Sequence, residues 1–91
     1  PSTFRDIALL LPAAMPAADV IACVTGVKAA ELEGVEIFDV YTGGNIARGE
    51  KSVAVRVRYG SRERTLTDDE VTRLHQRVTD SLQKKLNVSF R

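Results

Sequence analysis

The chain has 91 residues, of which 44% are hydrophobic and 27% charged, so it has room for one domain with one modest core. This composition is typical of ordinary folded domains and excludes disordered and fibrous chains. The net charge of +1 is too small to indicate a nucleic-acid partner by itself.

The first predicted element is a strand over the apolar run Ile7–Leu11, which Pro12 ends. A helix is expected next, beginning near Pro16 and ending between Val27 and Ala30. Its apolar stripe follows the i, i+4, i+7 spacing of one helix face. The stripe consists of Val20, Val24 and Val27.

Two strands follow, from Leu32 to Tyr41 and from Lys51 to Tyr59. In the second strand, valines alternate strictly with polar or small residues, as in a strand with one buried face. The polar loop between the strands contains glycines at positions 43, 44 and 49. These two strands are therefore predicted to form a hairpin.

The hairpin register decides which side chains share a face. If Tyr41 pairs with Ser52, then Asp39 faces Ala54 and Ile37 faces Arg56. Side chains alternate between the two faces of a strand. The outer face is then predicted to carry Ile37, Asp39, Tyr41, Ser52, Arg56 and Arg58. The inner face is predicted to carry Phe38, Val40, Val53, Val55 and Val57.

A long helix is predicted after the turn at residues 60–64. Thr67 and Glu70 have the T-x-x-E spacing of a capping box, which marks a helix N-terminus. Asn87 is expected to end the helix, and Val88–Arg91 to form a short last strand. The apolar face of the helix consists of Val71, Leu74, Val78, Leu82 and Leu86.

The predicted order is β-α-β-β-α-β over a single domain, residues 1–91. This order indicates an α+β, ferredoxin-like split β-α-β-β-α-β sandwich, with a four-stranded antiparallel sheet and two helices on one face. Right-handed crossovers place the first and third strands in the middle of the sheet. The other face of the sheet is left open, and it carries Asp39 and Tyr41.

Cysteine content and hydropathy indicate the cellular compartment of the protein. Cys23 is the only cysteine, so no internal disulfide is possible, and we expect it to be a small core residue. No apolar run approaches the ~20 residues of a membrane span. No basic segment precedes Ile7–Leu11, which argues against a signal peptide. We expect a cytoplasmic protein and, because the chain starts at Pro1, a piece of a longer one.

The sequence offers little for catalysis. His75 is the only histidine, and it lies at the edge of an apolar helix face, which favours a packing or capping role. The acidic run Asp68–Glu70 is explained by the helix N-terminus more simply than by a cation. The glycines at positions 43, 44 and 49 match no phosphate-binding motif and are interpreted as turn glycines.

The open face is the remaining candidate site. Residues 31–39 hold four acids and no base, whereas residues 48–64 hold six bases and two acids. An exposed aromatic with basic neighbours suits stacking of a nucleobase, which is how four-stranded sheets commonly bind RNA. The aromatic-rich octapeptide of the common RNA-recognition motif is absent. Binding of a protein or a metabolite through the same face therefore stays open as an alternative.

Several motifs together resemble one family. They are Arg5–Ala8, Phe38–Tyr41, Gly49–Ala54, Thr65–Val71 and Arg91. In this order and at these spacings, they are similar to the ferredoxin-fold anticodon-binding domain at the C-terminus of the bacterial phenylalanyl-tRNA synthetase beta subunit. The resemblance covers nearly the whole chain.

The resemblance implies binding of the anticodon stem-loop of phenylalanine tRNA, as a contribution to tRNA recognition for aminoacylation. It implies that Tyr41 stacks on an anticodon base and that Asp39 and Ser52 form hydrogen bonds with it. Three basic residues of the hairpin are expected to contact phosphates. They are Lys51, Arg56 and Arg58.

The resemblance also implies partners. The longer protein would pair with a synthetase alpha subunit in an α2β2 heterotetramer, and that subunit would use ATP and Mg²⁺ to activate phenylalanine. For the chain itself we expect no catalytic residue, cofactor, metal or membrane contact, and a monomeric state.

Overall fold

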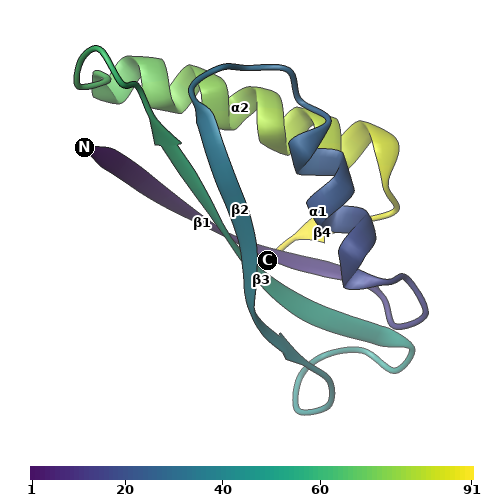
Figure 1. The fold of residues 1–91 in the computed structure, drawn as a ribbon. Coiled ribbons are helices and arrows are strands. Elements are labelled where there is room, and N and C mark those ends of the chain that lie inside the picture. Colours follow the sequence, from purple (N-terminus) through teal and green to yellow (C-terminus); the bar gives the residue numbers. More distant parts are fainter.

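The computed structural model describes residues 1–91 as one sheet with two helices (Figure 1). The elements are β1 (Ser2–Pro12), α1 (Ala17–Thr25), β2 (Leu32–Tyr41), β3 (Glu50–Gly60), α2 (Asp68–Lys85) and β4 (Ser89–Phe90). The strand order is β2-β3-β1-β4, and every pairing is antiparallel. This topology confirms the predicted ferredoxin-like fold, with β1 and β3 in the centre.

The central strands are longer than predicted. β1 begins five residues before Ile7, and it pairs with β3 without interruption from Ser2 opposite Gly60 to Pro12 opposite Glu50. The prediction of a strand confined to Ile7–Leu11 was therefore wrong. The apolar run marks only the part of the strand whose inward side chains, Ile7, Leu9 and Leu11, are buried in the core, whereas backbone pairing continues through polar residues whose side chains reach solvent.

The first helix is shorter than predicted. α1 ends at Thr25, not between Val27 and Ala30, and the amide of Gly26 closes its last turn on the Ala22 carbonyl at 3.0 Å. Gly26 has a low helix propensity, so the helix stops there although the apolar stripe continues. Val27 still packs against the core from the segment after the helix.

The second helix and the last strand follow the predictions with small changes. α2 ends at Lys85, and Leu86 is its C-terminal cap. β4 consists of Ser89 and Phe90 alone, opposite Leu10 and Leu9. Neither helix is both long enough and apolar enough to cross a membrane.

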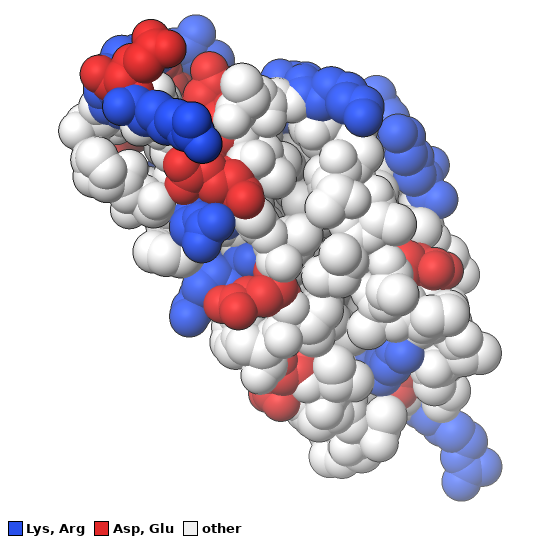
Figure 2. All heavy atoms as spheres, viewed as in Figure 1, with Lys and Arg blue, Asp and Glu red and all other residues white.

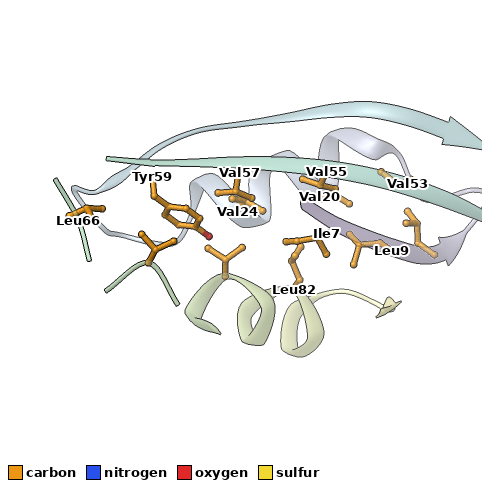
Figure 3. Packing of buried hydrophobic residues seen from close by; sticks show 13 residues of the cluster. Ile7, Leu9, Val20, Val24, Val53, Val55, Val57, Tyr59, Leu66 and Leu82 are labelled. Atoms are coloured by element: carbon orange, nitrogen blue, oxygen red, sulfur yellow. The ribbon is translucent and has the colours of Figure 1, made fainter. Parts of the chain in front are cut away.

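The hydrophobic core lies between the sheet and the two helices (Figure 3). β3 contributes four side chains to it, and the three valines among them are the inward positions that the sequence predicted. Leu82 of α2 packs from the opposite side, and Cys23 is partly buried against the cluster, as predicted. The β3 residues are Val53, Val55, Val57 and Tyr59. The sheet therefore has one covered face and one helix-free face.

A β-bulge interrupts the pairing of β2 with β3. Tyr41 pairs with Ser52 and Asp39 with Ala54, as predicted, but the register shifts at Phe38, and Ile37 lies opposite Val55 instead of Arg56. The bulge inserts one extra residue, so the alternation of faces is reset on either side of it. The predicted outward position of Ile37 was therefore wrong, and Ile37 packs against the core.

The same bulge moves Phe38 to the open face. Phe38 was predicted to face inward, but it is 49% exposed and its ring lies against Arg56, with 4.7 Å between the guanidinium carbon and the ring centroid. Val40 keeps its inward register opposite Val53 but is half-exposed. It is the last residue of β2 but one, and the end of the β2–β3 hairpin extends beyond the helices at the bottom of Figure 1.

A capping box begins α2, as predicted. The Thr67 hydroxyl accepts a hydrogen bond from the Glu70 amide at 3.2 Å, and the Glu70 carboxylate accepts one from the Thr67 amide at 3.0 Å. The Arg64 guanidinium also donates to this carboxylate. The Arg64 hydrogen bond and then the Thr67 amide lower the pKa of Glu70 to about 2.

Thr67→Ala is expected to lower the free energy of unfolding by about 1 kcal/mol, since it leaves a helix N-terminal amide without its partner. Thr65→Ala is the matched control, because Thr65 is exposed and precedes the helix. Urea unfolding of both variants checks this prediction. Equal stability of the two variants would contradict it.

Candidate nucleic-acid interface

Three side chains from three strand segments meet on the helix-free face. Tyr41 ends β2, Ser52 lies opposite it on β3, and Arg91 follows β4 at the far side of the sheet. Arg91 reaches across the face and donates to both the Tyr41 hydroxyl and the Ser52 hydroxyl, the latter at 3.0 Å. These three residues form the Tyr41–Ser52–Arg91 cluster.

The backbone of β1 positions Arg91. The Arg91 amide donates to the Ala8 carbonyl at 2.9 Å, which continues the pairing of β1 with β4 by one residue. The guanidinium carbon lies 5.3 Å from the centroid of the Tyr41 ring, within the range of a cation–π contact. Short residues, Ala8 and Ala54, occupy the neighbouring outward positions, so the long side chain can cross the sheet.

The cluster changes what Ser52 offers to a ligand. Ser52 points to the open face as predicted, but it is only 3% exposed, because the Arg91 side chain lies across it. Its oxygen accepts from Arg91, so the hydroxyl hydrogen is left for another acceptor. Tyr41 remains 39% exposed.

Asp39 completes the group of residues that the sequence placed together. It is exposed and lies opposite Ala54, two residues from Tyr41 on the same side of β2. Its carboxylate enters none of the ion pairs of the sheet. An exposed carboxylate beside a phenol ring can accept hydrogen bonds from the edge of a flat ligand that stacks on the ring.

The predicted phosphate contacts are placed differently. Arg56 donates twice to the Asp6 carboxylate, at 2.8 and 3.0 Å, which lowers the pKa of Asp6 and raises that of Arg56. Arg58 pairs with Glu33 at 3.5 Å. Lys51 lies opposite the buried Leu11, so strand alternation turns it to the helix side, away from Ser52.

Charges of both signs are mixed on this molecule. Figure 2 shows acidic and basic side chains next to one another along the left edge, in the region of β2 and the turn before α2. Arg56 and Arg58, two of the six bases of residues 48–64, are paired in space with acids from β1 and β2. Arg91 is the cation that the fold brings next to Tyr41.

His75 belongs to the core side of the domain. Its Nδ1 lies 2.7 Å from the hydroxyl oxygen of the buried Tyr59, and the two rings pack edge to face with centroids 5.8 Å apart. Burial, assisted by the nearby charge of Arg5, lowers the pKa of His75. This placement confirms the packing role that the sequence predicted. No group of three or more His, Cys, Asp or Glu side chains is arranged to hold a metal ion.

Stability is expected to fall between pH 7.5 and pH 5.5 because of His75. Its pKa in the folded state lies below the unfolded value of about 6.5, so the unfolded chain binds more protons as the pH falls. The free energy of unfolding should therefore decrease, by at most about 1.4 kcal/mol per pH unit for one proton. Urea unfolding across this range measures the slope. His75→Gln should remove most of it, since the chain has no other histidine.

Comparison with known proteins identifies the family. The model of the family described as "Ferredoxin-fold anticodon binding domain" matches residues 1–91. The chain belongs to this family. Its relatives include proteins named phenylalanine–tRNA ligase beta subunit from Geobacter sulfurreducens, Geobacter metallireducens and Desulfotalea psychrophila, which are 52%, 53% and 41% identical over 91 residues. The match covers 100% of this chain and 11% of each relative.

The position of Arg91 in this ferredoxin-fold anticodon-binding domain was not predicted. The sequence marked Arg91 only as part of the family resemblance, because no local pattern shows that a residue after β4 reaches β2 and β3. The exposure of Phe38 was also missed. The alternating pattern of β2 assigned Phe38 to the inner face. A bulge changes the face of the residues beside it without changing the sequence pattern, so alternation could not predict this exposure.

Proposed function

We propose that this chain is the module of a phenylalanine–tRNA ligase beta subunit that binds the anticodon stem-loop of phenylalanine tRNA. The observation that carries the proposal is the grouping of Asp39, Tyr41, Ser52 and Arg91 on the helix-free face. The family description and the names of the relatives support the same ligand. The module is non-catalytic and acts by holding the RNA.

Each residue has a role that its chemistry allows. The exposed Tyr41 ring stacks on a base, which contributes about 1–3 kcal/mol. Asp39 accepts hydrogen bonds from N–H groups on the edge of that base. Ser52 lies under the Arg91 side chain, so it donates its hydroxyl hydrogen to a base acceptor only when that side chain shifts to contact the RNA. Arg91 holds the Tyr41 and Ser52 hydroxyls with one nitrogen, and its other N–H groups face a phosphate.

The remaining proposals concern the longer protein. The chain spans 11% of the length of these relatives, and we propose that the machinery for activation lies outside residues 1–91. We place ATP and Mg²⁺ with an alpha subunit, in a cytoplasmic α2β2 assembly. No cofactor is assigned to residues 1–91.

A titration tests the proposal. The 91-residue chain is titrated with the phenylalanine anticodon stem-loop at rising salt, and with a stem-loop of the same length and a different anticodon as the control. We expect weak binding that falls as salt rises and that prefers the phenylalanine anticodon. Lack of binding to both RNAs at low salt would refute the proposal and leave the open face to a protein or metabolite.

Arg91→Gln is expected to weaken binding of the stem-loop and to reduce the slope of log affinity against log salt by about one unit, as the loss of one phosphate contact does. Arg73→Gln, an exposed change on α2 away from the open face, is the control and should leave the slope unchanged. Fluorescence anisotropy at four salt concentrations measures both slopes. An unchanged slope for Arg91→Gln would assign Arg91 to the positioning of Tyr41 alone.

A further inference from the structure

The open face carries two exposed phenylalanines that the proposed site does not use. Phe38 is 49% exposed and Phe4 is 54% exposed. The bulge turns Phe38 to the open side, where it lies beside Arg56. Exposed aromatic side chains gathered on one face are typical of a binding surface.

Arg56 joins the two rings into one strip. Its guanidinium lies over Phe38, and it is held in place by two hydrogen bonds to Asp6, two residues from Phe4 on the same side of β1. Two hollows of ≈ 220 and ≈ 480 Å³ lie here, and both are bordered by Phe4, Glu36 and Arg56. We call the residues Phe38, Arg56 and Phe4 the Phe38 strip.

The charges around the strip indicate what it can bind. Two nitrogens of Arg56 are engaged by Asp6, and Glu36 lies opposite Arg56 on β2, so the strip is poorly suited to a phosphate. The strip instead presents flat groups, namely aromatic rings and the plane of a guanidinium. A nucleobase stacks on such groups whatever its sequence.

The strip is continuous with the proposed RNA site. Phe38 immediately precedes Asp39, and residues 38 to 41 supply Phe38, Asp39 and Tyr41 to the same helix-free face. An RNA strand whose base stacks on Tyr41 therefore has a second stacking platform next to it.

We propose that the Phe38 strip is a second base-stacking site, which takes a nucleotide flanking the one held at Tyr41. This inference rests on the proposed RNA-binding function. The second site adds affinity through base faces and makes no phosphate contact, so it adds nothing to the salt dependence of binding.

The test compares Phe38→Leu with Phe90→Leu in titrations with the phenylalanine anticodon stem-loop. Phe90 is a matched control, because it is 40% exposed on β4 opposite the buried Leu9 and away from the strip. We expect Phe38→Leu to raise the Kd about tenfold with an unchanged salt slope, and Phe90→Leu to change it less than twofold. Phe38→Trp should bind at least as tightly as the unmodified chain.

Stem-loops with one base removed at each position in turn complete the test. One flanking abasic site should weaken binding to the unmodified chain about tenfold and binding to Phe38→Leu less than twofold, which shows that ring and base interact. If Tyr41→Ala weakens binding while Phe38→Leu binds like the unmodified chain, the second site is refuted and the proposed function stands. That outcome would assign the strip to a protein contact. No RNA binding by the unmodified chain would refute both.

Discussion

Tyr41→Ala is expected to weaken binding of the phenylalanine anticodon stem-loop by about 1–3 kcal/mol, or about 5- to 150-fold in Kd. The ring is 39% exposed on the helix-free face, and its hydroxyl accepts a hydrogen bond from Arg91, which also donates to Ser52. Removing it takes away the stacking platform and one of the two hydroxyls that hold Arg91. Anisotropy titration at fixed low salt measures the loss.

Tyr41→Phe separates the two effects. It keeps the ring but not the hydroxyl that accepts from Arg91, so most of the affinity should remain if stacking dominates. Thermal unfolding of both variants should give nearly the same midpoint as the unmodified chain, because Tyr41 lies outside the core. Equal RNA binding by Tyr41→Ala and the unmodified chain would remove the stacking role from Tyr41.

Leu82→Ala is expected to lower the free energy of unfolding by about 2–5 kcal/mol. Leu82 is fully buried, and in Figure 3 it extends from α2 toward Ile7 on the sheet. The substitution loses buried apolar area and leaves a cavity between two rigid layers. For a domain of this size, a loss of 2–3 kcal/mol corresponds to about 10–20 °C in Tm. Calorimetry and urea unfolding measure it.

Val40→Ala is the control for Leu82→Ala. Val40 has the inward register of the sheet, but it lies next to the end of β2 and is 48% exposed. Its replacement should cost less than about 1 kcal/mol. If both variants lose the same stability, the helix layer does not provide the burial that the fold indicates.

The candidate site was predictable only in part. Asp39, Tyr41 and Ser52 were placed on one face by alternation and by a register that the structure reproduces at Tyr41 and Asp39. Their use in RNA binding came from the family resemblance. Arg56 and Arg58 were predicted to contact phosphates, but acids from β1 and β2 pair with them. A count of charges along the chain cannot show which acids lie opposite, because the sheet brings together residues 50 positions apart.

Local sequence patterns were enough to predict the order of the elements, the buried face of β3 and the start of α2. Each of these depends on local periodicity or on a capping box, which act within a few residues. The tertiary structure decided the bulge at Phe38, the ends of β1 and α1, and the reach of Arg91 to Tyr41 and Ser52. These features depend on which strand lies alongside and on what covers it. The fold of this family can therefore be predicted from the sequence pattern. Its binding face, in contrast, forms only when four separate strands are paired.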